Sequence, residues 1–447
     1  MQPDIDEARA IANLQALIRI PTISRLDESE TDWTHFVAFR TELAKRYPAT
    51  HAALDLEIVD GHSMLFRWKG TGSDEPTVLM AHYDVVAATA EGWRHPPFSA
   101  ELVGSGEEQH IWGRGTLDDK GSLVSILEAV ETHAAAGFRP ADDIYLSFGH
   151  NEETAGSGAR VIVDLLESRG IRPGLVLDEG GAVVEGIFPG VTKPTAVVGV
   201  SEKGILSLRL TVEQQGGHAS TPPKLTATVR LARALVRLNR RPFRKSFVPT
   251  NLEMIRTLGA HATQPLKWVF TNLWLTRLPL LGLFARLGDE TNAIVRTTQA
   301  VTQLSGAQAA NALAERAEAI VNIRVAIDSS VAEAIEHVRR AIGDEQVAIE
   351  ALHPHEPSPV SPTSGAAWEL VKGTIEQSFP GTIVTPYVML GASDGRHFTR
   401  ISDHVYRFSP FEMSAEERGT LHAKNERMRV ATFLRGVGFY TRLVAAL

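Results

Sequence analysis

Residues 112–121 read Trp-Gly-Arg-Gly-Thr-Leu-Asp-Asp-Lys-Gly and place the acidic pair Asp118 and Asp119 in a turn bracketed by glycines. A run with helical pattern over residues 122–136 follows this turn directly. Glycine takes backbone conformations that are closed to other residues and lets the backbone approach a bound group closely. Carboxylates are costly to bury in an apolar core without a partner. The turn is therefore better suited to binding a ligand than to packing in a core.

Four other stretches carry side chains of the same chemistry, namely residues 81–84 (Ala-His-Tyr-Asp), 150–154 (His-Asn-Glu-Glu-Thr), 177–181 (Leu-Asp-Glu-Gly-Gly) and 421–426 (Leu-His-Ala-Lys-Asn-Glu). They supply histidines and carboxylates, whereas the chain of 447 residues contains no cysteine. Nitrogen and oxygen ligands without thiolates are typical of a hydrolytic centre with two zinc ions. We therefore predict two Zn²⁺ as the cofactor, and Co²⁺ or Mn²⁺ would also suit much of this ligand set.

Short apolar runs over residues 76–81, 143–148 and 174–177 each end at one of these stretches. Such runs are typical of strands buried on both faces of a parallel or mixed sheet. Segments 121–136 and 159–169 have the pattern of the covering helices. We predict an α/β fold with a mixed, mostly parallel sheet under helices. The candidate ligands would lie at the carboxyl ends of its strands, where open α/β sheets bind ligands.

The length of the chain predicts two domains. Beyond residue 204 the pattern changes, because residues 206–212 and 321–327 alternate between apolar and polar, as strands with one solvated face do. Helical runs follow both segments, and residues 347–351 have the pattern of a closing strand. We predict that this smaller unit is inserted into the larger one. The predicted domains are a catalytic domain formed by residues 1–203 and 354–447, and an inserted domain formed by residues 204–353.

The composition excludes some classes of partner. The formal net charge of −8 leaves no basic footprint for nucleic acid. Residues 1–7 are acidic where a secretory signal peptide would be basic and then apolar, so we expect a cytoplasmic protein.

Residues 266–287 are rich in Leu, Trp and Phe and are close to the length that spans a bilayer. Lys267, Arg277 and Arg286 interrupt the segment, Pro279 breaks it, and charges at membrane depth are costly. We predict a buried or groove-lining insertion and no spanning segment. Contact with a membrane surface is the alternative that stays open.

Local spacing suggests roles for two pairs of residues. His82 and Asp84 lie two apart in an extended chain and so face the same side. His82 can bind a metal while Asp84 fixes its ring through the other nitrogen. Adjacent Glu152 and Glu153 point apart, so one can bind a metal and the other can act as general base. Each pattern alone is also explained by a buried histidine with a chance neighbour or by a solvated acidic loop.

Taken together, the motifs resemble the M20 family of metallopeptidases, which includes carboxypeptidases, dipeptidases and aminoacylases. The resemblance runs in order through the whole chain. It rests on His82-x-Asp84, Gly113-Arg114-Gly115-x-x-Asp118-Asp119-Lys120-Gly121, Glu152-Glu153, Asp178-Glu179-Gly180-Gly181, Gly217-His218-Ala219-Ser220-x-Pro222 and His422-x-x-Asn425-Glu426. It implies a zinc-peptidase catalytic domain with an inserted α+β sandwich that serves as lid and dimerisation domain.

The resemblance also implies roles for single residues. Asp118 would bridge the two zinc ions, His82 and Asp178 would complete one site, and Glu153 and His422 would complete the other. Glu152 would be the general base. His218 of the lid would reach the active site of a second subunit in a homodimer and help to hold the oxyanion. A non-proline cis peptide bond is expected after Asp118.

The substrate is expected to carry a free carboxylate next to the scissile amide, because Arg396 in residues 391–396 matches the family's carboxylate-binding region. A structural pair between Asp394 and Arg396 is the alternative. A substrate contact from Asn311 is expected by position, although the prolines that surround it in the family are missing here. The apolar segment 266–287 resembles that of the subfamily with N-fatty-acyl amino acid hydrolases and vacuolar carboxypeptidases.

We therefore predict a zinc-dependent carboxypeptidase, dipeptidase or N-acyl-amino-acid hydrolase that acts on a small peptide or an N-acyl amino acid with an apolar acyl group. The alternatives are a small-acyl deacylase, of the acetylornithine or succinyl-diaminopimelate type, and a non-catalytic metal-binding protein that associates through the lid. The presence of Glu152 argues against the second, because binding alone needs no general base.

Overall fold

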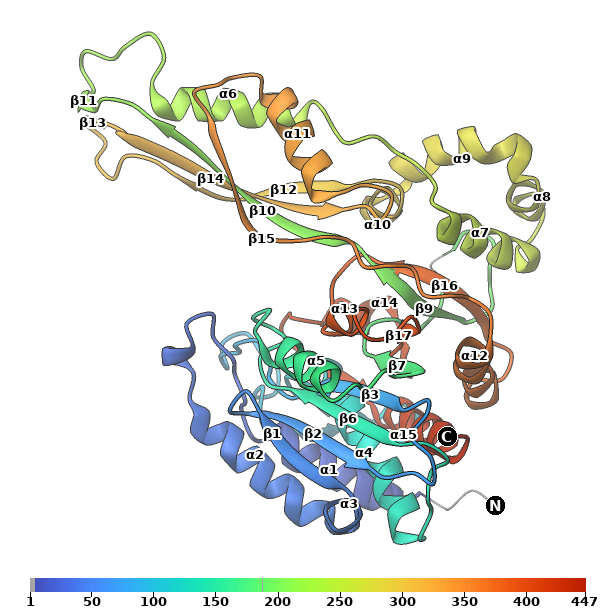
Figure 1. Ribbon diagram of the computed structural model, residues 1–447. Coiled ribbons are helices and arrows are strands. Elements are labelled where there is room, and N and C mark those ends of the chain that lie inside the picture. The colour runs from blue at the N-terminus through green and yellow to red at the C-terminus, as the bar shows by residue number, and fades with distance from the viewer. Residues whose placement is uncertain (1–4, 187) are drawn as a thin grey trace.

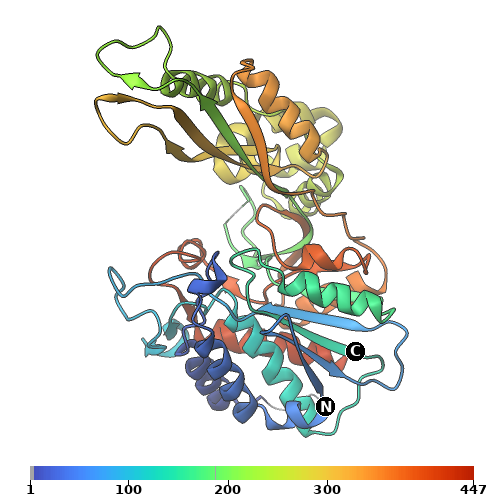
Figure 2. The ribbon, with the colours of Figure 1, turned by 60° about the vertical axis from the view of Figure 1, so that its left-hand side comes forward.

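The computed structural model describes residues 5–186 and 188–447. Two sheets lie in two parts of the molecule, a large sheet in the lower part of Figure 1 and a smaller one in the upper part, and Figure 2 shows the same division from another side. The lower part takes its strands from both ends of the chain, while the upper part takes them from the middle. The smaller sheet is therefore an insertion, as the change of pattern near residue 204 predicts.

The large sheet has ten strands in the order β1-β2-β6-β3-β7-β17-β9-β8-β18, with β16 paired beside β9. The pairs β6–β3, β3–β7, β7–β17, β9–β16 and β8–β18 are parallel. The pairs β1–β2, β2–β6, β17–β9 and β8–β9 are antiparallel. This confirms the predicted mixed, mostly parallel sheet. The strands are β1 (Asp55–Val59), β2 (Ser63–Trp68), β3 (Thr77–His82), β6 (Ile144–Gly149), β7 (Leu175–Asp178), β8 (Val183–Val184), β9 (Thr195–Glu202), β16 (Ile383–Met389), β17 (Val405–Arg407) and β18 (Glu412–Met413).

Every residue of β3, β6 and β7 is buried, because helices cover both faces of the sheet. Helix α4, which follows the Asp118 turn, buries thirteen of its sixteen residues, and so it lies inside the protein rather than on its surface. The helices of this part are α1 (Glu7–Ile18), α2 (Trp33–Arg46), α3 (Pro48–Ala53), α4 (Lys120–Ala135), α5 (Gly158–Ser168), α12 (Ala366–Ser378), α13 (Gly395–Phe398), α14 (Ala415–Arg418) and α15 (Val430–Ala445), with the short 3-10 helices η1 (Glu28–Glu30) and η2 (Gly106–Glu108).

A small three-stranded sheet joins two distant segments of the chain. It consists of β4 (Glu101–Val103), β5 (His110–Trp112) and β19 (Arg427–Arg429), and Arg427 lies opposite Trp112 in the antiparallel pair. This pairing holds the stretch that ends at Glu426 against the turn that begins at Gly113.

The inserted sheet has four antiparallel strands in the order β12-β14-β10-β15, and the helices α6 and α11 pack on it. Strand β10 buries every second residue, as the alternating sequence predicts. Strand β15 ends at His355, two residues beyond the predicted boundary. The elements are β10 (Gly204–Glu213), β11 (Gly217–His218), β12 (Thr298–Ser305), β13 (Ala312–Leu313), β14 (Arg316–Val325), β15 (Ala348–His355), α6 (Ala227–Asn239) and α11 (Val331–Ile342).

Residues 249–294 form a group of helices that the sequence did not predict as a separate body. The group consists of α7 (Pro249–His261), α8 (Leu266–Thr271), α9 (Leu273–Leu287) and α10 (Asp289–Ile294). Its core includes Ile383 of β16 and Val191, so it packs against the large sheet, although these residues belong to the predicted inserted domain. Within the described residues no helix has the length and apolar character needed to cross a membrane.

Candidate metal centre

The predicted ligands meet because three neighbouring strands end at one edge of the large sheet. Strands β3 and β6 run parallel with His82 opposite Gly149, and β3 also runs parallel to β7, which ends at Asp178. The chain therefore delivers His82, the Glu152–Glu153 pair and residues 178–179 to the same edge. This is the arrangement predicted from the apolar runs that end at polar residues.

Asp118 lies between two histidines that are far apart in the sequence. Its Oδ1 is 3.0 Å from Nε2 of His82, and its Oδ2 is 2.8 Å from Nε2 of His422. A carboxylate that offers one oxygen to each side has the geometry of a bridge between two metal ions. The peptide bond between Asp118 and Asp119 is cis, as expected from the resemblance.

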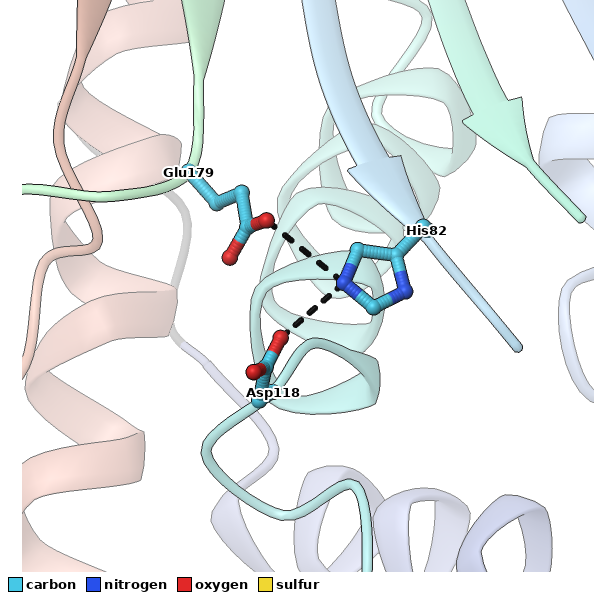
Figure 3. Close-up of side chains that lie close together, drawn as sticks. All are labelled: His82, Asp118 and Glu179. Atoms are coloured by element: carbon cyan, nitrogen blue, oxygen red, sulfur yellow. Dashed lines mark hydrogen bonds and ion pairs between the residues drawn. The ribbon is translucent and has the colours of Figure 1, made fainter. Parts of the chain in front are cut away.

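The first group of potential ligands consists of His82, Asp118 and Glu179 (Figure 3). Oε1 of Glu179 is 3.5 Å from Nε2 of His82. The sequence analysis assigned Asp178 to this position, whereas the structure groups Glu179 with His82 and Asp118, and the choice of ligand between Asp178 and Glu179 stays a prediction. Consecutive residues at the end of a strand point to opposite faces, and Oδ2 of Asp178 accepts a hydrogen bond from the backbone N–H of Gly395 at 2.6 Å.

The second group consists of Asp118, Glu153 and His422, the three residues expected there. Oε2 of Glu153 is 3.0 Å from Nε2 of His422. His422 is in the left-handed backbone region, with φ of 57°, and its side chain remains 57% exposed. The second group therefore opens to solvent on the side of His422, whereas the side chain of His82 in the first group is buried.

Negative charge accumulates at this edge of the sheet. Burial, and then the charge of Asp118, raises the pKa of Glu179 to about 8. Burial also raises the pKa of Glu152 well above its usual value, and the charges of Asp394 and Glu179 add to this effect. Hydrogen bonds to Asp118 and Glu153 raise the pKa of His422 to about 10. Neighbouring carboxylates contribute to each of these shifts, so several negative charges lie close together at this edge.

The residues fit a pair of divalent cations. Two groups of nitrogen and oxygen donors share one carboxylate, and Oε1 of Glu153 is buried without a hydrogen-bond partner among the described residues. A cation would satisfy that oxygen and compensate for the excess negative charge. The donor set, with one histidine in each group and no sulfur, suits Zn²⁺ and also Co²⁺ or Mn²⁺.

Asp84 holds both the first histidine and the glutamate pair. Nδ1 of His82, on the ring edge opposite Asp118, is 3.0 Å from the backbone carbonyl oxygen of Asp84 and 3.3 Å from its Oδ1. The same carboxylate accepts hydrogen bonds from the backbone N–H groups of Glu152 and Glu153 at 3.1 and 3.2 Å, and from the hydroxyl of Ser24 at 2.7 Å. Asp84 therefore positions His82 as the spacing predicts, and it positions the Glu152–Glu153 loop as well.

Glu426 positions the backbone of the turn that carries Asp118. Its Oε1 accepts backbone hydrogen bonds from Gly115, Leu117 and Asp118 at 3.0, 2.9 and 3.3 Å, and its Oε2 is 2.5 Å from Nη1 of Arg114. Both side chains of the pair are almost completely buried. The sequence analysis quoted both residues within motifs but assigned no role to either, because their contact joins positions more than 300 residues apart.

Glu152 and Arg396 lie near the groups without belonging to them. The charges of His82 and Asp394 act on the carboxyl of Glu152. Arg396 on α13 is close enough to the lid for its charge, together with burial, to lower the pKa of Arg324 on β14 and of His355 at the end of β15. Nε of Arg396 is buried without a partner among the described residues. The sequence analysis did not identify Arg324 as a candidate site residue, although its position in an alternating strand places it on the polar face.

His218 and Asn311 do not join the centre within one chain. They lie on β11 and just before β13, at the tip of the lid that is farthest from the large sheet in Figure 1. Nδ1 of His218 is 2.7 Å from Oγ of Ser220, and the carbonyl of Asn311 accepts a hydrogen bond from the N–H of Ala219 at 3.0 Å. Both residues are exposed.

Residues 78–446 match the family model described as peptidase family M20/M25/M40. The chain is 36% identical over 445 residues to N-fatty-acyl-amino acid synthase/hydrolase PM20D1 of Xenopus tropicalis, covering 98% of this chain and 86% of the relative. It is 34% identical over 447 residues to probable carboxypeptidase S-like 2 of Dictyostelium discoideum, covering 99% and 85%. Among solved structures it resembles the M20 family metallo-carboxypeptidase Sso-CP2 of Sulfolobus solfataricus, with a TM-score of 0.70 at 16% identity over 97% of this chain and 98% of the other.

Proposed function

Because the chain belongs to the peptidase family M20/M25/M40 and is a metal-dependent amide hydrolase, we propose that it uses two Zn²⁺. The bond that it hydrolyses would be the amide next to the free carboxylate of an N-acyl amino acid or a small peptide. One observation carries the proposal. Asp118 presents one oxygen to the group with His82 and the other to the group with His422. A single carboxylate shared in this way supports a centre with two ions.

Five residues would hold the two ions: His82, Asp118 and Glu179 on one side, and Asp118, Glu153 and His422 on the other. Zn²⁺ in such a centre lowers the pKa of water to about 7 and polarises the scissile carbonyl. Glu152 would accept the proton of the attacking water on its carboxylate and donate it to the leaving nitrogen. Glu152 is adjacent to Glu153 but belongs to neither ligand group, which supports this role, because its carboxylate is not needed to hold an ion.

Arg396 would bind the carboxylate of the substrate, and the proximity of the lid residue Arg324 supports that role. The charge of Arg396 acts on Arg324, and two guanidinium groups repel one another unless an anion lies between them. Neither arginine forms an ion pair with a carboxylate within 4 Å in the described part of the chain. A free carboxylate beside the scissile amide would compensate for both charges.

The names of the relatives support an apolar acyl group. Several are N-fatty-acyl-amino acid synthase/hydrolases, and others are carboxypeptidase S or its relatives. An amino acid that carries an acyl chain and a peptide with a free C-terminus share the same reacting unit, an amide followed by a carboxylate. The small-acyl deacylase alternative receives no support from these relatives.

The active unit would be a homodimer formed through the lid. Strand β12 is an edge strand of the four-stranded sheet, and its residues from Ala300 onward are exposed, including Leu304 at 67%. An exposed edge strand is a natural site for pairing with another chain. In such a dimer the lid tip with His218 and Asn311 would enter the centre of the other subunit.

Mixing two inactive variants, Glu152→Gln and His218→Ala, should then restore part of the activity, and no restoration would contradict a shared site.

The compartment predicted from the acidic N-terminal stretch stays a prediction, because it depends on sequence composition alone.

The experiment that tests the reaction is hydrolysis of a substrate panel by the zinc-loaded protein. The panel pairs N-acyl amino acids of increasing acyl length, and dipeptides, with the methyl ester of each compound. We expect cleavage that a chelator abolishes, that added Zn²⁺ restores and that the ester form lacks. Equal cleavage of acids and esters would contradict the role of Arg396. Absence of cleavage by a protein with two bound ions would favour the binding-protein alternative.

A further inference from the structure

The outer face of the α8–α9 pair carries six large apolar side chains that remain exposed. They are Trp268, Trp274, Leu275, Leu278, Leu283 and Leu287, and we call them the outer patch. Trp274 is 84% exposed and Leu278 is 77% exposed. Sixteen large apolar side chains are exposed in the described residues, and six of them fall within these 20 positions. Single exposed apolar residues are normal, but a cluster of this kind marks an interaction surface.

The fold does not require the outer patch. Helix α9 is attached through Leu273, Leu280, Leu281 and Phe284, which are buried in the core shared with Ile383 of β16. Trp274, Leu275 and Leu278 lie on the side of the helix away from these residues. Figure 1 shows α8 and α9 at the outer edge of the molecule, beyond α7. The sequence prediction of a buried insertion is thus correct for one face of the segment only. The other face is free to meet something outside the chain.

Cations lie within segment 266–287, and the acidic residues Asp289 and Glu290 follow it on α10, where Glu290 pairs with Arg418. Segment 266–287 contains Lys267, Arg277 and Arg286 but no acidic residue, in a chain whose net charge is −8. All three cations are exposed, and none forms an ion pair in the part of the chain that the structure describes. An apolar helix face with Trp and Leu, bordered by Lys and Arg, is typical of helices that lie in a membrane interface. An anionic surface is therefore the complementary partner.

We propose that the outer patch docks this protein onto the surface of an anionic lipid bilayer, with α9 lying in the plane of the interface. Trp268 and Trp274 would sit at the level of the headgroups, where tryptophan is enriched. Lys267 and Arg286 would contact lipid phosphates while their aliphatic stems lie along the acyl boundary, whereas Arg277 donates to the backbone carbonyl of Phe247. The helix does not enter as a span, because it has 15 residues and contains Pro279.

A second copy of the chain is a poorer occupant of this face. An isologous contact would bring the three cations of one copy against the same three of the other, without an anion in the segment to compensate. A lipid surface with negative headgroups faces no such repulsion. The docking rests on this surface alone and is independent of the proposed substrate.

The test is binding of the full-length protein to vesicles of phosphatidylcholine mixed with phosphatidylglycerol, compared with vesicles of phosphatidylcholine alone. We expect co-sedimentation with the anionic vesicles, a blue shift of the tryptophan emission and weaker binding as salt rises. The double variant Trp274→Ser/Leu278→Ser should lower the partition coefficient roughly tenfold or more, because two large apolar side chains no longer enter the interface. Lys267→Gln/Arg286→Gln should weaken binding to the anionic vesicles by roughly tenfold or more.

The matched control is Leu56→Ser/Leu102→Ser, which removes two exposed leucines outside the outer patch and should bind as the unchanged protein does. Thermal unfolding and hydrolysis of a soluble short-chain substrate should be unchanged in Trp274→Ser/Leu278→Ser, which separates docking from folding and from catalysis. Equal binding by that variant and the unchanged protein would overturn the proposal, as would no binding by either. Self-association that disappears in that variant, without vesicle binding, would assign the patch to a second copy and would also overturn it.

Discussion

The metal centre and the outer face of α9 are opposite exceptions to the usual distribution of side chains. The centre buries carboxylates, His82 and Arg114 at the end of a sheet, whereas α9 exposes tryptophan and leucine. Buried charges stay only where partners hold them, and Asp84, Glu426 and Arg114 are such partners here. The exposed patch has no such partner among the described residues. The buried charges of the centre are stabilised by residues of the same chain, whereas the exposed patch suggests a partner outside the chain.

The substitution with the largest expected effect is Glu152→Gln in the centre. Removing the proton acceptor should lower kcat about 10³-fold or more, because general acid–base catalysis contributes up to about 10⁴-fold. Glu152 belongs to neither ligand group, so both ions should remain bound, as elemental analysis of the purified variant can establish. Glu345→Gln on the lid surface is the control. A variant that retains ordinary turnover would remove Glu152 from the reaction.

A second comparison lies within the centre, between Glu179 and Asp178. Glu179→Gln should weaken one metal site more than about 100-fold, because it removes a direct ligand, whereas loss of a supporting group typically costs 10–100-fold. Asp178→Asn should have the smaller effect, because its carboxyl supports the backbone at Gly395. Competition with a chromophoric chelator measures both affinities. The reverse order would restore Asp178 as the ligand.

The smallest effect is expected on the outer face of α9. Leu278→Ser should change the free energy of unfolding by no more than about 0.5 kcal/mol, since the side chain is largely exposed. Leu280→Ser, two positions away on the buried face, should cost about 2–5 kcal/mol or more. Thermal unfolding followed by circular dichroism compares the two variants. Similar losses would mean that Leu278 is packed in solution and that the outer patch is not free.

Local pattern predicted those parts of the fold and the site that depend on neighbouring residues. The apolar runs before His82, Glu152 and Asp178 predicted buried strands, and parallel strands bring their carboxyl ends to one edge. The choice between Asp178 and Glu179 as ligand could not be made from local pattern, because it depends on the direction of each side chain at the strand end. The contact of Glu426 with the Asp118 turn and the proximity of Arg324 to Arg396 join residues too far apart for any local pattern to indicate.

The sequence by itself determined the class of the fold and the family, because strand burial, glycine turns and motif residues are properties of short segments. Only the tertiary structure decided which carboxylate oxygens face which histidines. It also decided that residues 249–294 pack on β16 rather than on the four-stranded sheet of the lid. It also decided which face of α9 is buried. These outcomes depend on which surfaces pack together. The sequence of an apolar segment such as 266–287 does not indicate whether its second face packs in a core or remains exposed.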